Sequence, residues 1–363
     1  LFSNCDNSTG PSSSECAGES SYWECASPEE VGLNGALLDE GDEFLLSVPY
    51  VYSVLVIKDD ALVFERYYNG SWAEREHNIF SVTKSVISTL VGIAIDQGYI
   101  SGLDLKAMDY FPEYANLEGV DARTEDITLE HLITMRAGFE SEGGDTWDEY
   151  YNSPDWFEHL FTSEMVADPG TRRNYTSYVA HMLSKVLVES TGQSVLSFAE
   201  ENLFTPLGID VAEWVQGPLG YEFGGTHLWL TPREIARFGY MALNGGAWEN
   251  QQIVSEDWLD RAVQYTSRWP DDTRWGGLDS LGYGYYWWLG NVRGHPVQLA
   301  LGYGGQTISI YKDLDMVVVT TANGFVGWDQ VQDEELLEWV SEYVVAGADT
   351  ASIEQSVSER GTP

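Results

Sequence analysis

The sequence predicts an α+β protein with one antiparallel β-sheet built from both ends of the chain and a helical subdomain inserted between. Residues near both ends alternate between apolar and polar types, as strands do, whereas apolar residues between about 81 and 265 recur at helical spacing. The 363 residues contain no internal repeat, so a domain over residues 28–346 can bury one large core. This order of elements predicts a cleft between the sheet and the inserted helices.

Residues 1–27 are predicted to form a polar arm. They are rich in Ser, Gly and Asn and poor in aliphatic residues, a composition typical of extended or weakly ordered segments. Residues 34–46 then carry apolar side chains at roughly helical spacing. Residues 51–57 and 61–67 alternate around a short Lys-Asp-Asp segment and predict a β-hairpin.

All three cysteines, Cys5, Cys16 and Cys25, lie in this arm. An odd number fits one disulfide and a spare thiol, and disulfides persist in oxidising compartments. We therefore expect an exported protein, periplasmic or extracellular. No run of residues is long and apolar enough to span a bilayer, and the sequence starts without a signal peptide, as a mature or trimmed form would.

Four segments of the inserted region predict helices. The first starts at Ser81 and ends near Gly98, and its apolar residues are so dense that we expect it to be buried. Residues 128–135 and 177–191 are amphipathic. Residues 231–243 open with Thr-Pro, which suits an N-cap and the first helical position.

The last part of the chain returns to strands. The pattern predicts them over residues 283–289, 306–312 and 316–321, the last two joined by a short turn. Residues 334–346 predict a closing helix. Residues 347–363 are polar and predict a frayed tail.

A Ser-x-x-Lys sequence opens the buried helix. Residues three apart on a helix lie on the same face about one turn apart, so the Lys84 amine can reach the Ser81 hydroxyl. A serine hydrolase without a His–Asp pair would use such a nucleophile and proton acceptor. The helix N-terminus would also favour negative charge that develops at Ser81.

A second Ser-x-x-Lys match, from Ser309 to Lys312, lies in a predicted strand. Residues three apart on a strand point to opposite faces, so we interpret this match as accidental. The chain has no Gly-x-Ser-x-Gly elbow, which disfavours an α/β-hydrolase. The spacing of its histidines and cysteines indicates no metal site.

The chain is strongly acidic, with 58 Asp and Glu against 18 Lys and Arg and a net charge of −40. This charge repels phosphates and argues against nucleic acids and anionic membranes as partners. We interpret it as a solvated acidic surface of the kind that a salt-adapted organism uses. Ca²⁺ sites in acidic loops such as residues 121–126 are the alternative, although no EF-hand loop is present.

Seven stretches of the sequence carry a resemblance to a known family. They are FSVTKS at 80–85, ITLEHLITMRAG at 127–138, DPG at 168–170 leading to YTS at 175–177, FTPLG at 204–208, LTPREIAR at 230–237, YGYYWW at 283–288 and GYGGQ at 302–306. Their order and spacing resemble the serine β-lactamase and penicillin-binding-protein superfamily, whose signature begins with Ser-x-x-Lys. More narrowly, they resemble its class C-like branch, with family VIII carboxylesterases and 6-aminohexanoate-dimer hydrolases. The similarity runs from about residue 27 to 346.

The resemblance implies a β-lactamase-like fold, no cofactor, and the catalytic set Ser81, Lys84 and Tyr175. Tyr175 starts the match to a Tyr-x-Asn motif in which Ser177 replaces the Asn, so that Ser177 would contact substrate or cap the next helix. A third family motif, Lys-Thr-Gly on an edge strand, falls on residues 300–302 and lacks its lysine, which leaves Gly302 beside the substrate. Loss of the Asn and the Lys favours neutral or differently charged esters and amides over β-lactams.

The implied reaction is acyl transfer in two steps. Ser81 attacks a carbonyl carbon while Lys84 and Tyr175 share its proton, and Tyr175 then protonates the leaving alcohol or amine. Water repeats the sequence on the acyl-enzyme. The backbone N–H groups of Ser81 and Tyr303 would form the oxyanion hole.

Three functions follow as hypotheses. The first is a serine hydrolase that cleaves small carboxylic esters or amides. The second is a β-lactamase or D-alanyl-D-alanine peptidase, in which another cation such as Arg293 would replace the missing lysine. The third is a non-catalytic relative that binds peptides or cell-wall fragments, which the intact catalytic set disfavours. Trp147 and Trp156, in a segment rich in Asp and Gly, are expected at the rim of the pocket.

Overall fold

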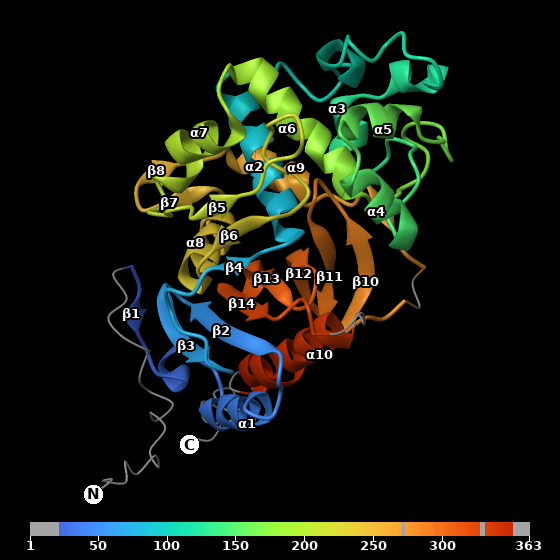
Figure 1. Ribbon diagram of the computed structural model, residues 1–363. Helices are drawn as coiled ribbons and strands as arrows, with labels where there is room; N and C mark the ends of the chain where they lie inside the picture. The colour runs from blue at the N-terminus through green and yellow to red at the C-terminus, as the bar shows by residue number, and fades with distance from the viewer. Residues whose placement is uncertain (1–21, 271–272, 327–330, 351–363) are drawn as a thin grey trace, which may run out of the picture.

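In the part of the chain that the structure describes, nine strands form one sheet, and strands from both ends of the chain meet inside it (Figure 1). The computed structural model describes residues 22–270, 273–326 and 331–350. Strand β2 (Val51–Lys58) pairs with β14 (Met316–Ala322), from Lys58 opposite Met316 to Val51 opposite Ala322. This pairing confirms that the sheet is built from both ends of the chain.

In spatial order the sheet runs β1-β3-β2-β14-β13-β12-β11-β10-β9. Its other strands are β1 (Glu24–Cys25), β3 (Ala61–Tyr67), β9 (Ser267–Arg268), β10 (Leu278–Tyr283), β11 (Trp288–Val292), β12 (His295–Gly302) and β13 (Gln306–Tyr311). Strand β1 runs parallel to β3, and the other neighbouring pairs are antiparallel. The predicted α+β fold is therefore confirmed, with a mixed sheet instead of a purely antiparallel one.

The end of the predicted N-terminal arm belongs to this sheet. Strand β1 lies within the arm, and the Trp23 side chain beside it is buried. Cys25 is disulfide-bonded, as the expectation of one disulfide requires. Cys5 and Cys16, like all of residues 1–21, lie outside the described residues.

Helices cover both faces of the sheet (Figure 1). Helix α1 (Gly35–Leu45) and the closing helix α10 (Val331–Trp339), which continues as a π-helix (Val340–Val345), lie on one face. Helices α8 (Pro232–Leu243) and α2 (Val82–Asp96) pack on the other. The alternation of β2 separates the two cores, because Val54 and Val56 join one apolar cluster and Leu55 and Ile57 join the other.

The inserted region lies beyond α2 and packs against it, chiefly through α6 (Ser177–Thr191). Its other helices are η2 (Ala107–Tyr110), η3 (Ala122–Asp126), α3 (Leu129–Ile133), α4 (Gly144–Tyr151), α5 (Trp156–Thr162), α7 (Val195–Ala199), η4 (Glu200–Phe204) and α9 (Glu256–Ala262); short helices η1 (Pro28–Val31) and η5 (Lys312–Leu314) lie elsewhere. Two small sheets pair β4 (His77–Asn78) and β5 (Glu213–Trp214) with β6 (Leu228–Leu230), and β7 (Ala247–Trp248) with β8 (Gln251–Gln252).

Local signals placed several helix ends correctly. Thr231 caps α8 by accepting a hydrogen bond from the Glu234 N–H, and Pro232 takes the first helical position. Helix α6 spans the predicted residues and ends at Gly192, whose φ of 72° is the left-handed conformation that glycine adopts readily.

Two of the strand predictions are wrong. Residues 283–289 are not one strand, because β10 ends at Tyr283, β11 starts at Trp288, and Tyr286 between them has a φ of 61°. Strand β12, which carries the third family motif, is not an edge strand, because β11 and β13 flank it.

Residues 347–350, assigned above to the frayed tail, pack on the body of the protein. The Gly347 carbonyl accepts a hydrogen bond from the Asn34 N–H, and Asp349 forms an ion pair with Arg293. Residues 351–363 lie outside the described residues. No helix in the described ranges is both long and apolar enough to cross a membrane.

Candidate active site

Ser81 stands at the N-cap of helix α2, at the end of a strained turn. Strand β4 leads into this turn, and the Ile79 N–H donates to the Leu228 carbonyl at 2.9 Å. Phe80 has a φ of 46°, a left-handed conformation that side chains rarely adopt, and its N–H donates to the Asn78 side chain at 2.9 Å. Strain of this kind gathers at functional sites, because the surrounding structure must hold it in place.

Lys84 lies one turn further along α2, and its side chain is only 1% exposed. Its Nζ donates to the Ser81 hydroxyl at 2.7 Å, to the Ser177 hydroxyl at 2.9 Å and to the Gly225 carbonyl at 2.7 Å. Burial lowers the pKa of Lys84 to about 8, against an opposing effect of the Glu142 carboxylate. A substantial fraction of the amine is therefore neutral near pH 8 and able to accept a proton.

Tyr175 completes the predicted set from the inserted region. Lys84 Nζ lies 4.8 Å from the centroid of the Tyr175 ring. Burial, and then the Glu142 carboxylate, raise the pKa of Tyr175, while a hydrogen bond with Ser81 lowers it in part. The phenol is therefore protonated in the resting protein and suited to donate a proton, which leaves Lys84 as the base.

Ser177 does not cap helix α6. Thr176 holds the N-cap position, where its side chain accepts a hydrogen bond from the Tyr178 N–H. The Ser177 hydroxyl accepts the bond from Lys84 and donates to Glu142 Oε1 at 3.0 Å. Ser177 is thus bonded to the catalytic amine, and the substrate contact expected for it stays a prediction.

Glu142 and Gly225 contact this set, although no sequence signal pointed to either. The Glu142 carboxylate accepts hydrogen bonds from both the backbone N–H and the hydroxyl of Ser177. A Cβ on Gly225 would lie 2.5 Å from the Ser177 Cβ, so only glycine fits beside the Lys84 amine. Both residues lie in loops, where periodicity carries no information.

The end of strand β12 packs directly against the turn that carries Ser81. A Cβ on Gly302 would lie 2.2 Å from the Ile79 carbonyl oxygen, and the Tyr303 ring lies 5.8 Å from the Phe80 ring. The backbone of Gly302 and Tyr303 is therefore next to the Ser81 segment. An oxyanion hole formed by the Ser81 and Tyr303 N–H groups would lie between these two segments. That role stays a prediction.

Trp288, whose ring lies close to Tyr175, also lines an aromatic pocket of about 370 Å³. The Trp288 ring lies 5.9 Å from the Tyr175 ring and 5.3 Å from the Trp269 ring. The pocket is lined by Trp269, Thr273, Arg274, Trp275, Leu281 and Trp288. Its walls combine indole rings with the Arg274 side chain, and the Arg173 guanidinium lies 3.9 Å from the centroid of the Trp269 ring.

Of the two tryptophans expected at the pocket rim, one is buried in the core, and the expectation for the other, Trp147, stays a prediction. Trp156 is a core residue, 4% exposed, with its ring 4.6 Å from the Phe223 ring, so the prediction for it is wrong. Trp147 is half-buried and stacks on Tyr178 at 5.3 Å. Neither contacts Ser81, Lys84 or Tyr175 by an aromatic or hydrogen-bonding interaction that the structure records for the described residues.

Arg293 cannot replace the lysine missing from the third motif. It lies in the turn before β12 and pairs with Asp349 at 3.0 Å, whereas Gly302 is at the other end of that strand. A strand rises about 3.4 Å per residue, so the two ends of this eight-residue strand are about 24 Å apart. The second Ser-x-x-Lys match is indeed split between β13 and the following turn, where Lys312 pairs with Asp260.

Metal-binding groups do not gather at this site. Within the described ranges, no three His, Cys, Asp or Glu side chains are arranged to hold a metal ion. In the acidic segment 121–126, Asp121 is bonded to the Arg123 guanidinium, which lowers the pKa of the carboxyl group to about 2.

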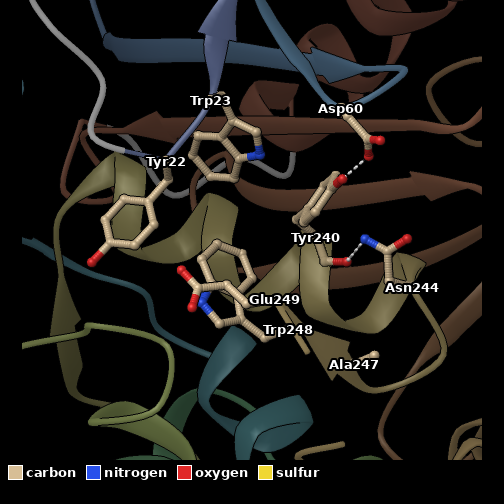
Figure 2. Close-up of a pocket in the computed structure, with 8 residues that line it drawn as sticks. All are labelled: Tyr22, Trp23, Asp60, Tyr240, Asn244, Ala247, Trp248 and Glu249. Atoms are coloured by element: carbon tan, nitrogen blue, oxygen red, sulfur yellow. Dashed lines mark hydrogen bonds between the residues drawn. The ribbon is translucent and has the colours of Figure 1, made fainter. Parts of the chain in front are cut away.

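A second pocket, of about 470 Å³, lies apart from the catalytic set (Figure 2). It is lined by Tyr22, Trp23, Asp60, Tyr240, Asn244, Ala247, Trp248 and Glu249. Figure 2 shows the Tyr240 hydroxyl directed at the Asp60 carboxylate, with which it forms a hydrogen bond. None of its lining residues touches Ser81, Lys84 or Tyr175 in the recorded contacts of the described chain.

A buried helix that opens with Ser-x-x-Lys, packed between a sheet and an inserted helical region that supplies a tyrosine, defines the serine β-lactamase and penicillin-binding-protein superfamily. The chain belongs to its Beta-lactamase family, whose family model matches residues 51–338. The match confirms the resemblance drawn from the sequence.

Individual relatives place the chain among hydrolases of this fold. It is 25% identical over 291 residues to a 6-aminohexanoate-dimer hydrolase of Paenarthrobacter ureafaciens, a match that covers 73% of this chain and 70% of the relative. The structure resembles a putative 6-aminohexanoate-dimer hydrolase from Bacillus anthracis, with a TM-score of 0.69 and 20% identity over 86% of this chain and 82% of the other. It also resembles a family VIII carboxylesterase, with a TM-score of 0.63 and 17% identity over 88% and 98% of the two chains. The chain thus belongs to the Beta-lactamase family, and its fold is shared by proteins named as amide hydrolases and carboxylesterases.

Proposed function

We propose that this protein is a serine hydrolase that cleaves small carboxylic esters or amides through an acyl-enzyme. The observation that carries the proposal is the buried Lys84 amine, 2.7 Å from the Ser81 hydroxyl and with a pKa lowered to about 8. A neutral amine at this distance can remove the hydroxyl proton as Ser81 attacks a carbonyl carbon. An ordinary surface lysine has neither the pKa nor the contact.

Tyr175 supplies the proton for the leaving group. Its raised pKa keeps the phenol protonated, and its contact with the Ser81 hydroxyl puts the phenol oxygen beside the seryl oxygen, where the leaving group departs. Backbone N–H groups of Ser81 and Tyr303 hold the negative oxygen of the tetrahedral intermediate. Lys84 passes the serine proton on to the Tyr175 phenolate, which restores both groups. Water then attacks the acyl-enzyme and gives its proton to Lys84, while Tyr175 protonates the departing Ser81 oxygen.

Linear esters and amides suit this site better than β-lactams do. The third motif has no lysine to bind a β-lactam carboxylate, and Arg293 is at the far end of β12. The aromatic pocket lined by Trp288, whose ring lies close to Tyr175, accepts an apolar group instead. A β-lactamase or D-alanyl-D-alanine peptidase remains the second candidate, because the fold and the catalytic set are common to both.

Turnover assays separate these functions. Hydrolysis of p-nitrophenyl butyrate and of a linear anilide is compared with hydrolysis of nitrocefin, with Ser81→Ala as the control. We expect turnover of the ester or the anilide to exceed that of nitrocefin and to vanish in the control. Faster turnover of nitrocefin would instead support the β-lactamase, and turnover of none of the three would support a non-catalytic binding protein.

The disulfide at Cys25 supports export to an oxidising compartment. The net charge of −40 supports a role that involves a small molecule instead of a nucleic acid or an anionic membrane.

A further inference from the structure

We propose that Glu142 is a positioning residue, which acts through Ser177 to aim the lone pair of the Lys84 amine at Ser81. The proposal rests on the proposed function, since it explains how the base of that reaction is oriented. Glu142 touches neither Ser81 nor Lys84 by hydrogen bond in the described structure, and its effect passes through the Ser177 hydroxyl.

Three hydrogen bonds of Glu142 join its loop to the segment that carries Tyr175 and Ser177. Its carboxylate accepts from the Ser177 N–H and from the Ser177 hydroxyl, the latter at 3.0 Å. Its own backbone N–H donates to the Tyr175 carbonyl at 3.1 Å. One residue therefore holds both Tyr175 and Ser177 against the loop that precedes α4.

These bonds determine the direction of every proton around Lys84. A hydroxyl group has one proton, and Ser177 donates it to the Glu142 carboxylate, which cannot itself donate when ionised. The Ser177 oxygen must therefore accept from Lys84, and so must the Gly225 carbonyl. When Lys84 loses one proton, its two remaining N–H groups keep these bonds, and the lone pair faces Ser81.

Glu142 also acts on the catalytic groups by its charge. Its carboxylate raises the pKa of Lys84 against burial, and it raises the pKa of Tyr175. Within the described residues, Tyr175 and His227 also lie near the amine, and burial together with Lys84 lowers the pKa of His227. Removal of the Glu142 charge therefore moves the pKa of Lys84 further down.

The test is the pH dependence of kcat/KM for p-nitrophenyl butyrate in the wild type, Glu142→Gln and Glu140→Gln. The amide of Glu142→Gln keeps the size of the side chain and loses the charge; Glu140 is exposed, two residues away, and serves as the matched control. We expect the acid limb of the Glu142→Gln profile to move to lower pH by about one unit, because an opposite charge nearby shifts a pKa by about 1–3 units. The Glu140→Gln profile should coincide with that of the wild type.

Truncation tests the orientation separately. Glu142→Ala and Ser177→Ala should each lower kcat by about 10- to 100-fold, as misplacement of a reacting group does, and the double variant should lose little more than either single one. If Glu142→Ala does not fold, as judged by circular dichroism, Glu142→Gln and Ser177→Ala carry the test.

Two results would overturn the proposal while the proposed function stands. One is a Glu142→Gln profile identical to that of an active wild type, and the other is full additivity of the two truncations. Failure of the proposed function looks different, because the wild type itself would then show no turnover and no Ser81 adduct with a fluorophosphonate.

Discussion

The Lys84 amine is bonded to the Ser81 hydroxyl at 2.7 Å from a position that is 1% exposed. Burial of an amine without an adjacent carboxylate favours its neutral form. In this protein the carboxylate of Glu142 acts across Ser177 and offsets only part of the effect, so that the pKa of Lys84 is about 8 instead of 10.5.

The first prediction concerns the pH dependence of activity. Because Lys84 must be neutral to accept a proton, kcat/KM for an ester should rise with pH and level off above about pH 8. A raised pKa keeps Tyr175 protonated over this range. Stopped assays between about pH 6 and about pH 9.5, corrected for spontaneous hydrolysis, measure this rise of kcat/KM with pH. If kcat/KM were still rising tenfold per pH unit at the upper end of this range, as the ordinary lysine pKa of 10.5 requires, the role given to burial would be contradicted.

The second prediction concerns the contact between β12 and the Ser81 turn. In Gly302→Ala the new Cβ would lie 2.2 Å from the Ile79 carbonyl oxygen. Both the strand and the Ser81 turn contribute backbone to this contact, so no flexible side chain can move to relieve it. We expect a loss of about 1–3 kcal/mol in the free energy of unfolding, together with a lower kcat. Gly143→Ala is the control, because a Cβ there meets nothing within 4 Å. Normal activity and stability of Gly302→Ala would show that the strand can move away without consequence.

The third prediction concerns Arg293. Its partners Asp349 and Glu342 are partly exposed, and it lies at the end of β12 remote from Gly302. Arg293→Ala should leave kcat/KM unchanged for esters and for nitrocefin and should destabilise the protein by less than about 1 kcal/mol. A selective loss of nitrocefin turnover would restore Arg293 as a substrate-binding cation.

The fourth prediction concerns the ion pair that fastens α8 to the sheet. Arg233 donates two hydrogen bonds to Glu65, at 2.7 and 2.9 Å, and the Glu65 side chain is 0% exposed. Glu65→Ala removes a fully buried carboxylate together with both of its bonds to the guanidinium, and should lower the free energy of unfolding by about 3–5 kcal/mol in urea titrations. The exposed pair of Lys106 and Asp126 is the comparison, and Asp126→Ala should cost less than about 1 kcal/mol. Equal effects at the two sites would mean that burial of the pair is unimportant.

The fifth prediction concerns the surface charge. A net charge of −40 destabilises a compact state through self-repulsion, and salt shortens the Debye length from about 30 Å at 0.01 M to about 3 Å at 1 M. The melting temperature should therefore rise as NaCl increases over this range, in support of a salt-adapted protein. Constant or falling melting temperatures would oppose that interpretation. Differential scanning calorimetry at fixed pH measures the change.

Much of the fold was predictable because its signals are local. The N-cap of α8 at Thr231 and the alternation of β2 each depend on neighbouring residues alone. The turn at Tyr286 was missed because a non-glycine residue adopts a positive φ there. Strand β12 was not predicted over its full length because six successive residues are buried on both sides, which erases the alternation.

The candidate site was predictable only in part, because some of its residues are brought together by tertiary packing and not by local sequence. Ser81 and Lys84 are one helical turn apart, and Tyr175 follows from the family motif. Glu142 is one of 58 acidic residues, and only tertiary packing brings its carboxylate to Ser177. Trp156 was misplaced because a tryptophan in a loop-rich segment suits a rim or a core equally well, and burial decides between them.

Covalent labelling of Ser81 tests the central claim most directly. The wild-type protein and Ser81→Ala are incubated with a fluorophosphonate and with penicillin, and intact masses are measured. We predict a single fluorophosphonate adduct on the wild type, located at Ser81 by peptide mapping, and none on Ser81→Ala. An unlabelled wild type, or an adduct that persists in Ser81→Ala, would contradict the assignment of Ser81 as the nucleophile.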